Sequence, residues 1–363
     1  VEPTYQKSRP LMDIHWRRDN EMKLIKAELL NALEIVKPGL ASRELIEQST
    51  SFAFLGGRVV TYNDEISISH PVAGIDFEGA IKAEELYQLL NKTKKDEIEL
   101  VAEENEVRIV AGRTKAGITF QTEVKLPLEE LGEIDNWKAV PENFAAALKF
   151  VQFTCSKDMA GQPVLACVHI QKKGKDKGVI ESCDNVRLTR YQIGKVPIES
   201  SVLIPVGNVK ELLKYPITEM AEGNGWVHFR TKTETVFSCR VMSGDEYPNV
   251  DKSGILTVEG TDVEFPTSIG EILDRAAIFV NKDYVTGDNV QVTLHANKLK
   301  IRGQSEAGWL EETAKMVYEG PEITFMVPPL FLKDILDQTN KCVIGAEKLK
   351  FQGENWEYVA ALS

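Results

Sequence analysis

Apolar side chains recur at the spacing of an amphipathic helix in six short segments of this chain. The segments form two sets of three, and their apolar positions align column by column. The columns of the first set are Leu29/Phe144/Ile269, Leu33/Leu148/Leu273 and Val36/Val151/Ala276. The columns of the second set are Leu86/Val209/Leu332, Leu89/Leu212/Ile335 and Leu90/Leu213/Leu336. Six short helices are therefore predicted, and four follow a proline expected at the first helical position: Pro141, Pro205, Pro266 and Pro328.

The period of this repeat is the size of a domain. Successive copies lie about 115 to 125 residues apart, far beyond the 20–50 residues of a solenoid repeat. The pattern predicts three similar domains, 22–139, 140–260 and 261–363, each with two equivalent helices. Three similar domains in a row suit a ring or an arch better than an ordinary enzyme.

Between the helices, the pattern changes to the alternation typical of half-buried strands. Strands are predicted at 98–101, 107–110, 117–121, 164–170, 235–239 and 290–294. Turn residues separate them at 104–105, 174–176, 223–225 and 296–297. Antiparallel sheets with a few helices indicate an α+β fold.

The first 21 residues lack this periodicity. Met22 reads as a natural start, so residues 1–21 are interpreted as an extension or an added remnant outside the fold. The His15-Trp16-Arg17-Arg18 cluster could instead contact DNA.

Composition is that of a soluble globular protein, with 43% hydrophobic and 27% charged residues in 363. The longest apolar stretch, 144–155, is too short to span a bilayer, and no secretory signal is visible. The five cysteines are widely spaced and form no C-x-x-C pair. Buried free thiols in a reducing cytoplasm are therefore expected, with no metal site and no disulfide framework.

The net charge of −12 argues against a protein covered in basic patches for nucleic acid. The charge is nevertheless segregated. The six helical windows, 24–37, 82–95, 141–157, 205–215, 266–282 and 328–341, hold 14 Lys and Arg against 10 Asp and Glu. Their net charge is +4, so the remainder carries −16. Helices commonly carry lysine on their exposed face, but Lys210 and Lys333 occupy the same repeat position.

No catalytic or cofactor motif is present, including those of nucleotide-binding loops, zinc proteases and serine hydrolases. The five histidines are far apart and are expected to be structural. Adjacent acids such as Asp245 and Glu246 could supply acid–base chemistry in a hydrolase. Neighbours on a strand point to opposite faces, however, so these acids are interpreted as solvated charges. The sequence predicts a protein without catalytic activity, cofactor or metal.

Four segments resemble those of the bacterial sliding clamp, the beta subunit of DNA polymerase III. Residues 236–249, VFSCRVMSGDEYPN, resemble the family pattern F-x-S-[KR]-L-[VI]-x-G-x-[FY]-P-[DN]. Residues 183–188, CDNVRL, are similar to T-D-G-H-R-L, and residues 275–278, RAAI, to R-A-[AS]-I-L. Residues 112–115, GRTK, resemble the segment that leads to an edge strand in the first domain. With the threefold repeat, the resemblance covers the chain from Met22 to its end.

The resemblance implies a head-to-tail homodimeric ring around duplex DNA, with the helices lining the hole. Such a clamp is a replication processivity factor that binds a clamp loader, a replicative DNA polymerase and other proteins with a clamp-binding motif. Contacts to phosphates alone are independent of sequence and weaken with salt. The DNA-facing candidates are basic residues on or beside the six helices: Lys26, Lys37, Arg43, Lys92, Lys94, Lys95, Lys149, Lys157, Lys210, Lys214, Arg275, Lys282, Lys333 and Lys341.

The resemblance also implies a pocket for partner peptides between the second and third domains. Its matching positions are Leu165, Arg187, Leu188, Pro248, Tyr284, Phe331, Val359 and Ala360. Apolar walls with one guanidinium suit an apolar anchor and a polar backbone. Leu165 and Leu188 could instead be interdomain core. Asn185-Val186 replaces the Gly-His of the family, and residues 358–363, YVAALS, replace its M-P-M-[RK]-L ending. Both departures suggest an altered peptide preference and a divergent phage or prophage member.

Ring closure is expected where an edge strand around Ile118 pairs with the third domain of the other subunit near Ile278 and Phe279. These residues could instead be ordinary core. A triplicated peptide-binding module that does not encircle DNA remains the alternative function.

Overall fold

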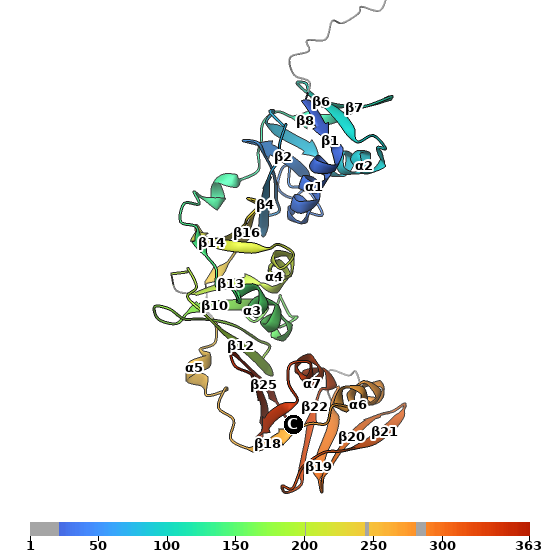
Figure 1. The fold of residues 1–363 in the computed structure, drawn as a ribbon, viewed down its shortest axis with the longest axis vertical. Coiled ribbons are helices and arrows are strands. Elements are labelled where there is room, and N and C mark those ends of the chain that lie inside the picture. The colour runs from blue at the N-terminus through green and yellow to red at the C-terminus, as the bar shows by residue number, and fades with distance from the viewer. Residues whose placement is uncertain (1–21, 200, 244–246, 281–287) are drawn as a thin grey trace, which may run out of the picture. The chain divides into compact units, whose positions relative to one another are not determined.

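The computed structural model describes residues 22–199, 201–243, 247–280 and 288–363. Residues 1–21, predicted to be an extension, therefore lie outside the described residues. The chain divides into two compact units, Val1–Leu128 and Glu129–Ser363 (Figure 1). The division into three domains at 22–139, 140–260 and 261–363 remains a prediction.

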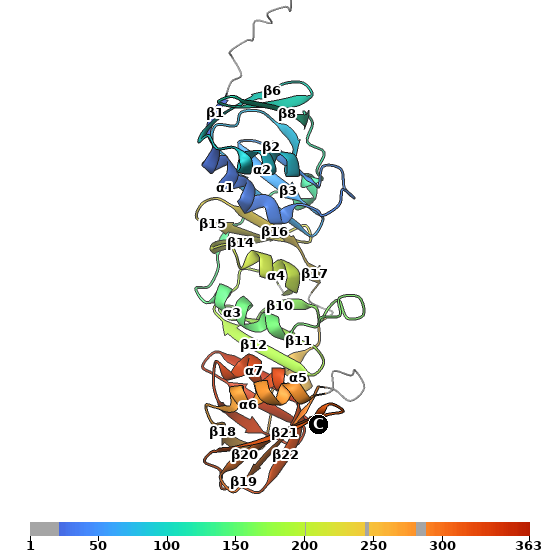
Figure 2. The same cartoon turned by 90° about the vertical axis from the view of Figure 1, so that its right-hand side faces the viewer.

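The first unit packs two helices on one antiparallel sheet. Its helices are α1 (Lys26–Val36) and α2 (Ala83–Lys92), and a 3₁₀ turn, Lys37–Gly39, follows α1. Its strands are β1 (Met22–Ile25), β2 (Ser51–Leu55), β3 (Arg58–Tyr62), β4 (Ile66–Pro71), β5 (Gly79–Lys82), β6 (Glu97–Ala102), β7 (Glu106–Ala111) and β8 (Thr114–Gln121). They lie in the order β1-β6-β7-β8-β5-β2-β3-β4. The two helices contact each other, α1 also contacts β3 and β4, and α2 contacts β2 and β5, so both cover one face of the sheet (Figure 2).

The second unit begins with a set of strands and two helices. The helices are α3 (Phe144–Val151), which continues as a 3₁₀ turn (Gln152–Thr154), and α4 (Val206–Leu212). The strands are β9 (Lys138–Ala139), β10 (Cys167–Lys172), β11 (Gly178–Cys183), β12 (Arg187–Ile193), β13 (Ser201–Pro205), β14 (Ile217–Gly223), β15 (Trp226–Thr231), β16 (Val236–Arg240) and β17 (Met242–Ser243). A short helix, α5 (Val250–Ser253), follows them.

The rest of this unit contains a second set of strands with two helices. Its last two long helices are α6 (Ile269–Ala276), continued by a 3₁₀ turn (Ala277–Phe279), and α7 (Pro329–Leu336). The strands are β18 (Thr261–Glu264), β19 (Val290–His295), β20 (Lys298–Ser305), β21 (Gly308–Lys315), β22 (Ile323–Val327), β23 (Lys341–Ile344), β24 (Lys348–Gln352) and β25 (Trp356–Ala361). Within this unit, α3, α4, α6 and α7 lie on one side of the sheets, and α5 lies on the other (Figure 1).

A nine-stranded sheet joins the two halves of the second unit. Its order is β17-β13-β10-β11-β12-β25-β24-β23-β18. The junction is the antiparallel pair β12–β25, in which Arg187 lies opposite Ala360 and Leu188 opposite Val359. Smaller sets, β16-β15-β14-β9 and β21-β20-β19-β22, accompany it. The sheet therefore runs without interruption across the predicted boundary at residue 260.

The six predicted helices are all present, and the aligned apolar columns form their buried faces. Every member of the first set of columns is at most 2% exposed. In the second set, Leu86, Val209 and Leu332 are equally buried, whereas Leu89, Leu213 and Leu336 are only half-buried. The helices thus bury a narrow stripe, as a helix packed on a sheet does.

Two sequence expectations about local structure were wrong. No proline among the four occupies the first helical position: Pro205 and Pro328 are N-caps, whereas Pro141 and Pro266 lie two residues before the N-caps Asn143 and Ser268. The strand predicted at 164–170 begins only at Cys167 because residues 163–166 form a turn.

The predicted turns and thiols are confirmed. The tight turns contain left-handed residues, among them Asn224 at φ 51° and Asn297 at φ 61°, and asparagine tolerates this conformation better than most residues. All five cysteines are free and buried. Among the described residues, no helix is both long and apolar enough to cross a bilayer.

Candidate functional site

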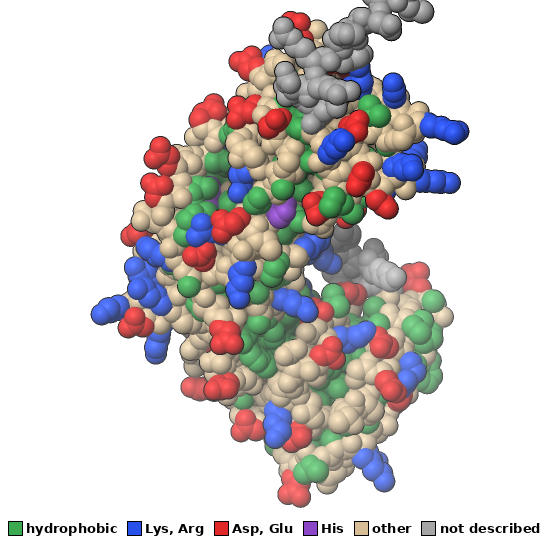
Figure 3. Space-filling model, turned by 45° about the horizontal axis from the view of Figure 1, so that its top comes forward, with side chains coloured by type: hydrophobic (Ala, Val, Ile, Leu, Met, Phe, Trp, Pro, Cys, Tyr) green, Lys and Arg blue, Asp and Glu red, His purple; other side chains and the backbone are tan. Residues whose placement is uncertain are grey.

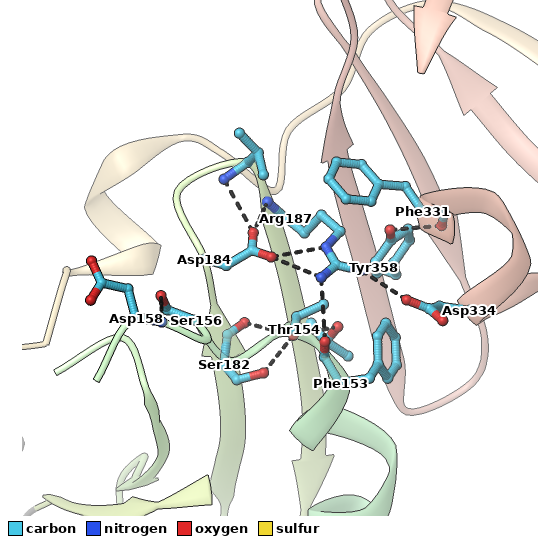
Figure 4. A network of polar contacts seen from close by, with 12 residues as sticks. Phe153, Thr154, Ser156, Asp158, Ser182, Asp184, Arg187, Phe331, Asp334 and Tyr358 are labelled. Atoms are coloured by element: carbon cyan, nitrogen blue, oxygen red, sulfur yellow. Dashed lines mark hydrogen bonds and ion pairs between the residues drawn. The ribbon is translucent and has the colours of Figure 1, made fainter. Parts of the chain in front are cut away.

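A tight turn between β11 and β12 positions Arg187, the first residue of β12. Asn185 has φ 74°, in the left-handed region, and the Asp184 carboxylate accepts hydrogen bonds from the backbone N–H groups of Val186 and Arg187 at 3.3 and 2.8 Å. This Asx-type turn is a local property of the Asp184-Asn185 pair. It directs the Arg187 side chain toward α7 (Figure 4).

The Arg187 guanidinium is the centre of a buried network (Figure 4). Its Nε and Nη2 donate to Asp184 Oδ2 at 3.0 and 2.8 Å, and its Nη1 donates to Asp334 Oδ2 at 2.8 Å. Nη2 also reaches the Phe153 carbonyl at 3.4 Å, and the guanidinium lies 4.3 Å from the centroid of the Phe331 ring. Arg187 is only 6% exposed, so these internal groups use most of its donors.

Burial sets the direction of the pKa shift for two members of this network. It raises the pKa of Asp334, although the neighbouring Arg187 favours the charged carboxylate. Desolvation likewise raises the pKa of the Tyr358 hydroxyl, which donates to the Phe331 carbonyl at 2.8 Å. The network therefore connects β12 and β25 to α7 by hydrogen bonds whose polar groups have little contact with water.

Three apolar members of the predicted pocket, Leu188, Val359 and Ala360, lie in the β12–β25 junction itself. Leu188 and Val359 are both 2% exposed, and Ala360 is fully buried. Leu165 and Phe331 are half-buried, and Pro248 is exposed. Tyr284 lies outside the described residues. Leu165, Phe331 and Pro248 are accessible to a ligand in this conformation. The buried Leu188, Val359 and Ala360 instead pack below the surface.

Sequence reasoning missed Asp184, Asp334, Phe153 and Tyr358, which complete the network around Arg187. Asp184 belongs to the matched CDNVRL segment, so its proximity could have been anticipated. Asp334 lies 147 residues from Arg187, and no local pattern signals that contact.

Two of the basic candidates share a groove between α3 and α4. The groove measures about 420 Å³ and is lined by Ala145, Ala146, Lys149, Gln152, Lys210 and Leu213. Lys149 and Lys210 are exposed, and neither forms an ion pair with any described residue. Small residues leave the groove open, so both ammonium groups can reach an anion.

A second basic hollow lies in the first unit, where α2 ends beside the β7–β8 turn. It measures about 640 Å³, and its lining includes Lys92, Lys94, Lys95 and Arg113. Arg113 belongs to the GRTK segment but was not among the predicted residues. Elsewhere in this unit Arg43 is exposed, Lys26 donates to the Thr93 carbonyl at 2.8 Å, and Lys37 lies 3.9 Å above the Tyr87 ring.

Other basic candidates in the second unit have internal carboxylate partners. Lys214 pairs with Glu211 at 2.7 Å, Arg275 with Glu312 at 2.7 Å and Lys341 with Glu264 at 3.7 Å. Lys333 pairs with Asp274. Lys157 is exposed, and Lys282 lies outside the described residues. Partnered cations attract phosphate less, so Lys149, Lys157 and Lys210 are the stronger candidates in this unit.

The structure contains the two edges needed for the predicted dimer. Residues 114–119 of β8 pair with β7, and the pairing of β8 with β5 begins at Phe120. At the other end of the chain, β21 is the terminal strand of its sheet. Ile118 is buried at 7% exposure, Ile278 is 72% exposed, and Phe279 is half-buried against the backbone of Gly308 in β21.

No group of three or more metal-binding side chains occurs within the described parts of the chain. The cysteine thiols are likewise poorly suited to chemistry, because burial raises the pKa of Cys155 to about 12 and that of Cys167 to about 11.

Paired helices packed on antiparallel sheets, repeated along the chain, define the DNA-clamp fold, and comparison with solved structures confirms it. A DnaN sliding clamp (DNA polymerase III subunit beta) from Pseudomonas aeruginosa, bound to griselimycin, matches with a TM-score of 0.82 and 17% identity over 95% of this chain and 99% of that chain. The beta subunit from DNA polymerase of Streptococcus pyogenes matches with a TM-score of 0.82 and 18% identity over 94% of this chain and 99% of that chain. A putative DNA polymerase III beta subunit from Eubacterium rectale matches with a TM-score of 0.81 and 15% identity over 95% of this chain and 99% of that chain.

No protein-family model and no curated protein sequence matches the chain. The particular fold is thus that of the DNA polymerase III beta subunit, as the sequence motifs predicted, at a sequence identity that establishes the fold alone.

Proposed function

We propose that this protein is a DNA sliding clamp, a replication processivity factor without catalytic activity. Two copies form a head-to-tail ring around duplex DNA. The observation that carries the proposal is the fold likeness to beta clamps over 94–95% of the chain and 99% of theirs. A likeness of this extent includes all six repeated helices rather than one shared domain.

The DNA contacts of this clamp are sparse lysines on helices of an acidic protein. The principal candidates are Lys149 and Lys210 in the α3–α4 groove, and Lys92, Lys94 and Lys95 at the end of α2. Such contacts bind phosphates without reading bases. Retention comes from encirclement, so each contact can stay weak enough for sliding.

Partner proteins dock at the β12–β25 junction in this proposal. The replicative polymerase, the clamp loader and other proteins with a clamp-binding motif would place an apolar side chain against Leu165 and Phe331. Support comes from the pairing of Arg187 with Ala360 and of Leu188 with Val359 at this junction. Because Asp184 and Asp334 neutralise Arg187, apolar contacts and backbone hydrogen bonds dominate recognition.

Ring closure in this proposal joins the edge of β8 in one subunit to β21 of the other. Main-chain pairing would satisfy both exposed edges. Ile278 beside β21 is a large apolar side chain at 72% exposure, which a subunit interface would cover.

The decisive experiment compares retention on circular and linearised duplex DNA after loading. The protein should remain on the circle and slide off the free ends of the linear form. Capping the linear ends with bulky protein blocks should restore retention. Equal loss from both forms would refute encirclement and favour a peptide-binding module that does not surround DNA.

A further inference from the structure

The hairpin between β10 and β11 carries an unusual concentration of positive charge for this protein. Four of the six residues from 172 to 177 are lysines: Lys172, Lys173, Lys175 and Lys177. The Lys173 N–H donates to the Lys177 carbonyl at 2.8 Å, and Gly174 adopts φ 76°. The turn is therefore a closed hairpin, and all four lysines lie at or beside its tip.

Two further lysines join the hairpin in space. Gly178 lies opposite Ile193 in the sheet and close to the Gly194 carbonyl and Val196, which brings Lys195 beside Lys177. Lys173 Nζ forms an ion pair with Asp251 Oδ2 of α5 at 2.5 Å, which brings in the adjacent Lys252. We call these six residues the lysine surface: Lys172, Lys173, Lys175, Lys177, Lys195 and Lys252.

The lysine surface is largely uncompensated. Asp176 and Asp251 are the acids within it, which leaves a net charge of +4 on a chain of −12. Apart from Lys173, none of its lysines forms an ion pair with a described residue. Some lysines elsewhere do pair with carboxylates, as in Lys82–Glu44 and Lys350–Glu357. Figure 3 shows Lys and Arg side chains gathered where this hairpin projects.

The lysine surface is distinct from the α3–α4 groove. Alternate residues of a strand face opposite sides of a sheet, and here Ser182 and Thr189 bond to Thr154 beside α3. Their neighbours Glu181 and Arg190 point the other way, where Arg190 pairs with Asp251 of α5 at 2.6 Å. Lys173 also faces α5, so this side of the lysine surface lies away from the helices of the proposed DNA channel, whereas Lys172, its neighbour in the chain, points to the opposite face of the sheet.

The composition of the surface indicates its ligand. All six cations are lysines, which act as point charges toward phosphates. Protein interfaces instead favour arginine and aromatic residues and are depleted in lysine. No aromatic residue belongs to the surface, so it offers no platform for stacking single-stranded bases.

We propose that the lysine surface is a second, sequence-independent binding site for the phosphate backbone of duplex DNA. It lets the protein hold a DNA segment that does not pass between the repeated helices. The inference concerns direct binding and does not depend on encirclement.

The test measures the affinity for a short blunt duplex of arbitrary sequence by fluorescence anisotropy at several NaCl concentrations. The background is Lys149→Ala/Lys210→Ala, which weakens the groove between α3 and α4. Adding Lys172→Ala, Lys175→Ala and Lys177→Ala should reduce affinity roughly tenfold or more at low salt and lower the slope of log K against log salt by about 2 to 3.

The matched control removes three exposed lysines spread over the same unit, by Lys138→Ala, Lys232→Ala and Lys298→Ala. It has the same net charge and should bind as the background does. Equal effects of the two triple variants, or no effect of the hairpin variant, would overturn the proposal. The hairpin variant should still remain on circular DNA after loading, so failure of encirclement and failure of this site are separate results.

Discussion

Arg187 matches a family motif that implies a role in partner binding, but its side chain is buried and bonded to internal groups. The sequence placed it in a peptide pocket. The structure buries its guanidinium between Asp184, Asp334 and the Phe331 ring. Removing one partner of a buried ion pair exposes the full desolvation cost of the other. Arg187 is therefore expected to be important for stability as well as for partner binding.

Substituting Arg187→Met should lower the free energy of unfolding by about 3 kcal/mol, because two largely buried carboxylates lose their cation. Urea unfolding followed by circular dichroism measures this. Arg302→Met is the control: its guanidinium is 40% exposed and 4.0 Å from Glu311, and such surface pairs contribute less than about 1 kcal/mol. Similar losses for both variants would contradict the assigned role.

His228 makes stability depend on pH in a predictable direction. Burial lowers its pKa to about 4, and its Nδ1 lies 2.7 Å from Ser238 Oγ. An unfolded histidine titrates near pH 6.5, so between pH 6.5 and 4 the unfolded chain binds the extra proton. The contribution of neutral His228 to the free energy of unfolding is complete above pH 6.5. It falls by about 2 to 3 kcal/mol as the pH drops to 4.

Urea unfolding of the wild type and of His228→Gln across this pH range measures the effect. The variant should lose this part of the pH dependence. His295→Gln, at a site 63% exposed, should keep the wild-type profile. An unchanged profile in His228→Gln would show that other groups cause the slope.

At the scale of elements, each of the six repeated helices packs on a sheet through one narrow apolar stripe. That requires close approach of helix and strand backbones at some positions. Gly303 in β20 is one of them, since a Cβ there would lie 2.4 Å from the Ala276 carbonyl oxygen at the end of α6. Gly207 in α4, by contrast, has nothing within 4 Å of its hypothetical Cβ.

The pair predicts opposite effects of the same change. Gly303→Ala should destabilise the protein by about 1 to 3 kcal/mol, because the added methyl forces α6 and β20 apart. Gly207→Ala should be neutral or stabilise by up to about 1 kcal/mol, because alanine favours the helix. Thermal unfolding of both variants provides the measurement, and a stabilising Gly303→Ala would refute the packing argument.

At the scale of the whole molecule, the proposed function needs two copies of the chain. The apolar residue that most directly suggests a subunit contact is Ile278, which is 72% exposed next to the edge strand β21. A second subunit that paired with this edge would cover the Ile278 side chain.

Ile278→Asp should convert the dimer to a monomer, because association would bury an unpaired carboxylate. Size-exclusion chromatography with light scattering distinguishes the two states. Val317→Asp is the control, since Val317 is 88% exposed but lies outside the proposed interface, and this variant should remain dimeric. A wild-type monomer, or a dimeric Ile278→Asp, would contradict the proposed closure.

The sequence by itself determined the helices, their buried faces and most turns. Leu29, Leu148 and Leu273 are core residues because helical periodicity is a local property that a linear sequence records. The repeat of that pattern at domain spacing, together with the segments at 183–188 and 236–249, was enough to predict the clamp fold. Charge counting also located the helices that carry the positive excess.

Only the tertiary structure decided which charges are available and how the distant segments meet. The β12–β25 pairing joins residues more than 160 positions apart, and Arg187 meets Asp334 across a similar separation. Lys333 and Arg275 have carboxylate partners, whereas Lys149 and Lys210 face an open groove. Contacts between distant residues depend on chain topology, and no local period encodes them.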